Sequence, residues 1–159
     1  VGEVIDYAYE HANTKKRLKN FIKNPFDGFG YGLFRTETIR GVRFPVWVWP
    51  NQKVSWNNIY PTLCFYLAKG NYKHVYDEPL FLKRIKTKVN HSQPAKRMRR
   101  EVFAFSIRKI NLSFSSFNSI QQANGIKLAL IAFPTLLNYF TFQPIKNLFI
   151  QVVKEKLRP

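Results

Sequence analysis

Apolar residues recur at helical spacing in four stretches of this chain, and these stretches predict its main elements. Residues 3–23 alternate apolar side chains with Lys and Arg, which predicts a helix that ends before Pro25. Residues 60–69 are almost wholly apolar and predict a second helix. Two further helices are predicted over residues 101–126, which are rich in Ser and Asn, and over residues 146–158, where apolar and basic positions occupy opposite sides.

The segments between these helices carry shorter patterns. Thr36 stands where a helix N-cap is expected, so residues 36–41 predict a short helix. Residues 43–58 hold three tryptophans and two prolines in no regular order, which predicts a surface loop. Residues 72–76 and 80–85 predict two short strands.

An uncharged stretch of residues, 128–145, precedes the last predicted helix. Its length approaches that of a membrane-spanning helix, but Pro134, Pro144 and several polar residues interrupt it, and we expect the two prolines to break it. Together with the basic amphipathic helix over residues 146–158, it fits a segment that lies in the interface of an anionic leaflet. A pair of core helices with a basic exterior fits the same pattern, and both alternatives stay open.

The charge balance points to an acidic partner. The 159 residues contain 26 Lys and Arg but only 9 Asp and Glu, for a net charge of +17, which favours nucleic acid, anionic lipid or a phosphorylated substrate. Residues 86–100 carry much of this charge without an acid or an aromatic residue, so they give the phosphate contacts of a nucleic-acid site without its stacking platforms. Membrane contact is therefore better supported than nucleic-acid binding.

The sequence offers little metal or nucleophile chemistry. His11, His74 and His91 stand far apart, with no paired cysteines, so no metal site is predicted. The single cysteine, Cys64, excludes an internal disulfide and fits a reducing compartment. Because Cys64 lies among apolar residues of a predicted helix, we expect a buried inert thiol.

Three motifs follow one another in the first half of the chain. They are GFGYGLFRT over residues 28–36, LCFYLAKGNY over residues 63–72 and PLFLKR over residues 79–84. Their order and spacing resemble the C-terminal half of the catalytic domain in family 2 glycosyltransferases, which are inverting enzymes. The resemblance implies an α/β fold, here an α+β remnant with a few strands and several helices. It assigns residues 1–90 to the acceptor side of the catalytic domain. Residues 91–159 would then be a basic helical extension, for which we expect association with a membrane.

The resemblance also implies a function. The enzyme would move a sugar from a nucleotide-sugar to a glycan or lipid-linked acceptor, as a cytoplasmic protein held peripherally on the inner membrane face. The family's nucleotide-binding half, with its Asp-x-Asp motif, has no counterpart here. We therefore expect a portion of a longer enzyme that is inactive alone and binds no metal itself, with Mg²⁺ or Mn²⁺ held mainly by the other half.

Site residues follow from the resemblance as well. The acceptor side would comprise Gly30, Gly32, Trp47, Trp49, Trp56, Asn57 and Asn58, since tryptophans stack on sugars, amides bond hydroxyls and glycines allow close approach. The donor diphosphate would meet Arg84, Lys86, Lys88 and His91. The catalytic base stays unknown, because residues 55–60 hold no carboxylate. Loop aromatics that merely pack on the domain, and a solvated basic loop, are the alternatives.

A second hypothesis needs no enzyme. The chain would be a basic module that binds RNA or an anionic membrane through residues 86–109 and 146–158.

Overall fold

The computed structural model describes residues 9–26, 34–42, 47–49, 52–54, 59–73 and 98–156. In chain order the elements are α1 (Thr14–Lys23), α2 (Thr36–Ile39), β1 (Trp47–Trp49), β2 (Gln52–Val54), α3 (Ile59–Lys69), α4 (Met98–Asn124), α5 (Ile126–Leu136), the π-helical segment η3 (Leu137–Phe142) and α6 (Gln143–Lys156). Helices dominate this part of the chain.

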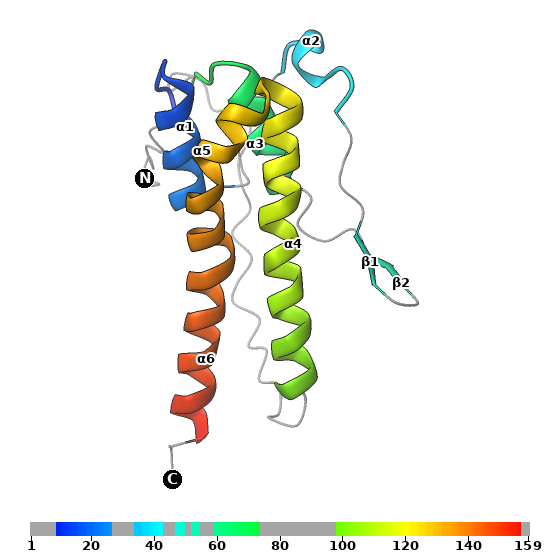
Figure 1. Ribbon diagram of the computed structural model, residues 1–159, viewed down its shortest axis with the longest axis vertical. Coiled ribbons are helices and arrows are strands. Elements are labelled where there is room, and N and C mark those ends of the chain that lie inside the picture. The colour runs from blue at the N-terminus through cyan, green and yellow to red at the C-terminus, as the bar shows by residue number, and fades with distance from the viewer. Residues whose placement is uncertain are drawn as a thin grey trace, which may run out of the picture.

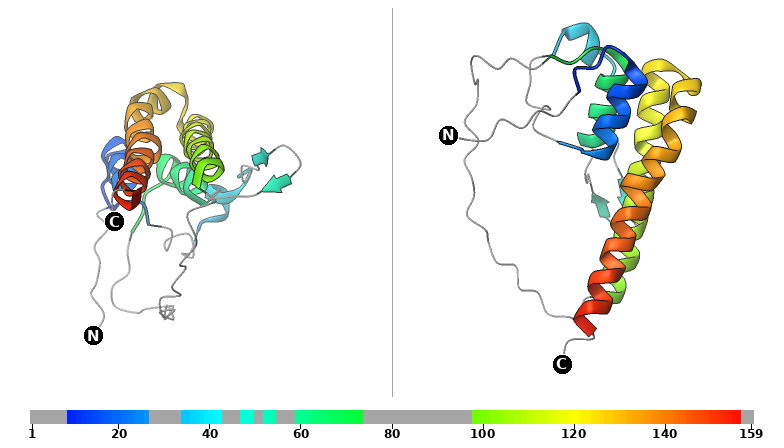
Figure 2. Two further views of the ribbon diagram at one scale, coloured as in Figure 1. Left: turned by 90° about the horizontal axis from the view of Figure 1, so that it is seen from below. Right: turned by 90° about the vertical axis from the view of Figure 1, so that its left-hand side faces the viewer.

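The longest elements form an antiparallel pair. Helix α4 runs the length of the molecule, and α5, η3 and α6 return beside it as one unbroken helical rod (Figure 1). Gly125 joins the two with φ +84°, a left-handed conformation that glycine adopts without strain. Helices α1 and α3 pack against one side of this pair, near the Gly125 end (Figure 2). The other end of the pair, with α6, extends beyond them.

The expected α/β fold is wrong for the described residues. Their strands are only β1 and β2, which pair antiparallel with Trp47 opposite Val54, Val48 opposite Lys53 and Trp49 opposite Gln52. Thr36 begins a helix, and Tyr72 and Lys73 lie in no strand. The physical reason lies in the second half of the chain, where long runs with few charges form two helices that bury much of the core.

The two prolines do not break the uncharged stretch, contrary to expectation. Pro134 lies inside α5 and Pro144 inside α6. A proline removes one backbone donor from a helix and crowds the preceding turn. Segment η3 occupies the turn before Pro144, and a π-helical segment is a known way to accommodate such a misfit. The rod therefore continues from Ile126 to Lys156.

The predicted helices agree with the structure except at some ends. Helix α1 begins at Thr14, not before residue 10, because the side chain of Asn13 caps it by accepting from the backbone N–H groups of Lys15 and Lys16. Arg35, not Thr36, is the N-cap position of α2, and no side chain bonds there. The predictions of α3, α4 and α6 are confirmed, and α3 ends directly before Gly70 as expected.

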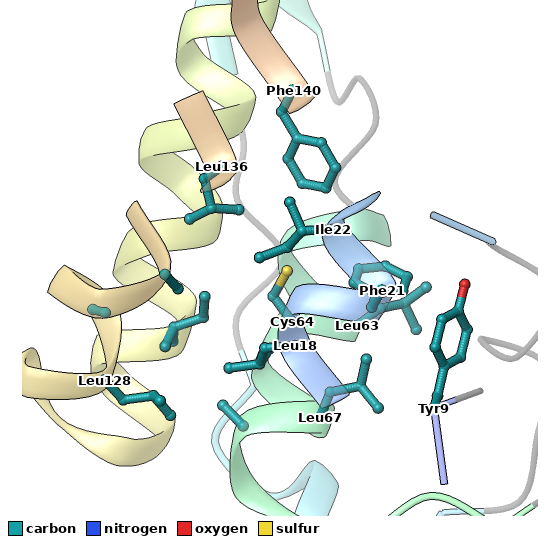
Figure 3. Close-up of a cluster of buried hydrophobic side chains, with 14 of the residues drawn as sticks. Tyr9, Leu18, Phe21, Ile22, Leu63, Cys64, Leu67, Leu128, Leu136 and Phe140 are labelled. Atoms are coloured by element: carbon teal, nitrogen blue, oxygen red, sulfur yellow. The ribbon is translucent and has the colours of Figure 1, made fainter. Parts of the chain in front are cut away.

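The hydrophobic core lies where α1, α3, α4 and the α5–η3 rod meet (Figure 3). Its members come from both sides of residue 90, the boundary expected between catalytic part and extension, so both parts share one core. The largest buried apolar side chains are Tyr9, Leu18, Phe21, Ile22, Leu63, Leu67, Ile120, Leu136 and Phe140.

Cys64 lies inside this core and is fully buried, as the sequence predicted. Burial raises the pKa of its thiol to about 12, and the neighbouring Ser116 hydroxyl acts weakly in the other direction. We expect the folded chain at pH 8 to resist a thiol-specific aromatic disulfide reagent, whereas the urea-unfolded chain reacts completely. Rapid, complete modification of the folded chain would contradict this placement.

A small polar cluster fixes the register between α4 and the rod. The Ser113 hydroxyl donates to the Leu136 carbonyl at 3.0 Å and lies 2.8 Å from the Thr141 hydroxyl. Thr141 Oγ1 in turn donates to the Lys109 carbonyl at 3.1 Å. Both side chains are buried, so sliding of the helices would leave their hydroxyls unpaired at a cost of about 1–3 kcal/mol each.

Candidate membrane-binding surface

Most of the site residues predicted from the sequence lie outside the described part of the chain. These are Gly30, Gly32, Trp56, Asn57, Asn58, Arg84, Lys86, Lys88 and His91. The backbone of Trp47 and of Trp49 lies in β1, so the predicted loop over residues 43–58 contains a short hairpin instead. The roles assigned to all these residues stay predictions.

The described residues carry a different candidate site, which begins on α4. Phe103, Ile110 and Phe114 are exposed, Phe103 by 65% of its surface. Their spacings of seven and four residues place them on one face of the helix. A helix normally buries its apolar stripe against the core. The buried face of α4, however, carries Leu112, Ser116 and Ile120, and not these three residues. This helix therefore shows an apolar stripe to solvent.

The returning rod shows a second apolar stripe. Ile126, Leu130 and Ile131 are exposed on α5, and Phe142, Phe149, Ile150 and Val153 are exposed on η3 and α6. The ring of Phe133 contacts the rings of Phe114 and Phe117, with centroids 5.5 and 5.1 Å apart, and so joins the two stripes. We call the exposed apolar side chains of α4, α5, η3 and α6 together the paired-helix surface.

The charges of the helical pair are placed unevenly. From residue 110 to residue 145 the only charged residue is Lys127, which is exposed beside the Gly125 connection. Lys109, near the middle of α4, has its ammonium 5.2 Å from the Phe105 ring centre, and burial lowers its pKa. Lys146 and Lys154 are exposed on α6. Exposed cations of the rod therefore lie beside the Gly125 connection and along α6.

A shallow depression runs along the start of α6 within this surface. Its described lining consists of Asn138, Phe142, Gln143, Ile145, Lys146, Phe149 and Ile150. Apolar side chains supply most of this lining. Lys146 is the one charged residue among the described residues that form it.

Comparison of the chain with protein-family models, curated proteins and solved structures found no match. The paired-helix surface is therefore interpreted from its own chemistry.

That chemistry is suited to an amphiphilic partner. Within the described residues no group of three His, Cys, Asp or Glu side chains gathers that would hold a metal ion. The helix from Ile126 to Lys154 is long and apolar enough, by length and composition, to cross a membrane. A lipid surface is the partner that offers both apolar chains and fixed negative charge.

Part of this surface was predicted from the sequence. The basic amphipathic helix over residues 146–158 was expected, but the stripe of Phe103, Ile110 and Phe114 on α4 was not. The signal was present in their spacing, and a stripe of this kind most often packs into a core. Only the arrangement of the helices shows which stripe is left exposed.

Proposed function

We propose that this chain binds peripherally to the surface of an anionic membrane through the paired-helix surface. The observation that carries the proposal is that three phenylalanines of the helical pair, Phe103, Phe142 and Phe149, are strongly exposed, and that the stretch from residue 110 to residue 145 bears only one charge. Each of the three is exposed by at least 61%.

The apolar side chains supply one part of the binding free energy. Moving a fully exposed Phe out of water is worth about 1.5–3 kcal/mol. Three rings that are about three-fifths exposed therefore contribute roughly 3–5 kcal/mol when they enter the boundary of the acyl chains. This is marginal on its own, because a peripheral protein also loses freedom of motion when it binds.

The cations supply the other part. A Lys or Arg near an anionic leaflet adds about 1 kcal/mol, and Lys127, Lys146 and Lys154 are all exposed on the rod. The net charge of +17 adds long-range attraction that salt screens. Binding therefore needs both an apolar boundary and negative charge, and a cytoplasmic location on the inner membrane face, where anionic lipids are exposed, fits this need.

Peripheral binding is better supported than a membrane span. The first third of the long rod, α5, packs against α1. Helix α1 exposes Lys15, Lys16, Lys19 and Lys23, which belong in water or at headgroups and not in the acyl region. A rod that crossed the bilayer from Ile126 to Lys154 would pull these four lysines into the membrane or break the core.

The first test is binding of the purified chain to vesicles. We expect it to co-sediment with vesicles that contain phosphatidylglycerol, to bind pure phosphatidylcholine vesicles weakly, and to lose only part of its binding at high salt, because the apolar part is not screened. A chain that ignores anionic vesicles but binds RNA, with an affinity that falls steeply with salt, would contradict the proposal in favour of a nucleic-acid module.

We also retain the proposal that the chain is part of an inverting glycosyltransferase. It is supported by the succession of motifs between residues 28 and 84 and by α3, which ends at Lys69 directly before the Gly70-Asn71-Tyr72 of the second motif. The two proposals are compatible, because a lipid-linked acceptor lies at the membrane. The expected result is no turnover of nucleotide-sugars by this chain alone, and robust turnover would contradict the assignment to an acceptor-side half.

A further inference from the structure

We infer that the depression along the start of α6 is a binding site for a single anionic lipid, with the lipid phosphate at Lys146 and its chain across Phe142, Phe149 and Ile150. This inference rests on the proposed membrane binding. It adds that one lipid molecule binds at a defined site within the paired-helix surface.

Lys146 lies among exposed apolar side chains of the same helical face. On an α-helix the neighbours of residue 146 on the same side are three and four positions away, which are Phe142, Phe149 and Ile150. All three are exposed, and all three line the depression together with Lys146. Among the described side chains no carboxylate forms an ion pair with Lys146. Lys146 therefore supplies a cation within the apolar lining of the depression.

The polar groups around Lys146 narrow the ligand class further. Asn138 and Gln143 line the same depression and are exposed. Their amides donate hydrogen bonds, as the ammonium does, so the described lining offers several donors to an oxyanion. A soluble anion makes no use of the phenylalanines, and a neutral lipid makes no use of the lysine. An anionic lipid uses both.

Helix α6 also contains an internal control. Lys154 is exposed eight residues after Lys146, but it does not line the depression. Both lysines contribute equally to a diffuse attraction between the chain and a charged surface, because each carries one charge at the same end of the helical pair. Only Lys146 contributes to a defined site.

The experiment compares K146Q with K154Q. Calorimetric titration uses dihexanoyl phosphatidic acid below its micelle concentration, with inorganic phosphate and dihexanoyl phosphatidylcholine as the other two probes. We expect saturable binding of one phosphatidic acid to the wild-type chain and to K154Q, a loss of about tenfold in affinity for K146Q, and much weaker binding of the two other probes. Both substitutions are at exposed positions, and circular dichroism checks that both variants fold.

Three results would overturn the inference: equal affinities of K146Q and K154Q, binding of inorganic phosphate as tight as that of phosphatidic acid, or no saturable binding by the wild-type chain. If the wild-type chain nevertheless co-sediments with anionic vesicles, the failure concerns this site alone and the proposed membrane binding stands. If the vesicles are not bound either, the proposed function fails as well.

Discussion

Replacement of Arg17 by Met is expected to lower the free energy of unfolding by about 3–5 kcal/mol. Arg17 is 2% exposed, and its guanidinium connects the start of α1 to the end of α3. It donates from Nε to the Leu67 carbonyl at 2.9 Å and from Nη1 to Asn71 Oδ1 at 3.0 Å. It also donates to the carbonyls of His11 and Ala12 and to the Thr14 hydroxyl.

The energetic reason is the loss of one buried and four partly buried hydrogen bonds. None of the acceptors around Arg17 is a carboxylate, so the cation is held by neutral oxygens and by the negative end of the α3 dipole, where Leu67 lies in the last turn. Burial lowers the pKa of Arg17, which nevertheless keeps its proton. Met fills the space but leaves the Leu67 carbonyl without this buried donor.

The measurement is urea unfolding followed by far-ultraviolet circular dichroism. R17K keeps the charge but lacks the planar fork, so we expect an intermediate loss. K19M, at an exposed position two residues away, is the matched control and should change stability by less than about 0.5 kcal/mol. A stability of R17M within about 1 kcal/mol of wild type would show that the guanidinium does not tie α1 to α3.

Replacement of Phe21 by Ala is expected to cost about 3–5 kcal/mol as well. The Phe21 side chain is fully buried in the core (Figure 3). Its ring meets Tyr9 and Tyr60 edge to face, with centroids 5.5 and 6.1 Å apart. Ala leaves a cavity between α1 and α3 and removes both aromatic contacts.

The matched control for F21A is F149A, the same change at a ring that is 62% exposed. Because the Phe149 ring is largely in water already, its removal leaves no large cavity, and we expect the free energy of unfolding to fall by less than about 1 kcal/mol. Thermal and urea unfolding of both variants measure the difference. Similar losses for the two would mean that Phe149 is buried against something, and would remove a main support of the paired-helix surface.

The helices were largely predictable from the sequence, because local signals mark them. Asn24-Pro25 and Gly70 stand where α1 and α3 end, and apolar spacing indicated the helices themselves. The helix predicted over residues 101–126 ran past Gly125, directly before which α4 ends. The start of α1 was misplaced because Asn13 caps it with its side chain, while the apolar pattern continues toward the N-terminus. Because the apolar spacing does not change at Asn13, it does not indicate that the helix begins there.

The fold class was predicted wrongly. The prediction used motifs in the first half of the chain, whereas the longest helices lie in the second half. Residues 128–145 were expected to be broken at Pro134 and Pro144, yet the rod continues through both prolines and carries Leu128, Leu136 and Phe140 into the core. The candidate surface was only half predictable for a related reason. Phe114 and Leu112 are equally apolar, and only the packing of α3 and α5 on α4 decides that Leu112 is buried and Phe114 is exposed.

The most direct test of the account is the vesicle binding of F142S/F149S, in which both exposed rings at the α6 end are replaced. The loss of two rings that are about three-fifths exposed should weaken binding to phosphatidylglycerol vesicles at least about twentyfold, with little change in stability. I39S, which replaces an exposed apolar residue of α2 away from the helical pair, should bind like wild type. Co-sedimentation of F142S/F149S equal to that of wild type would contradict the claim that the paired-helix surface is the membrane-binding face.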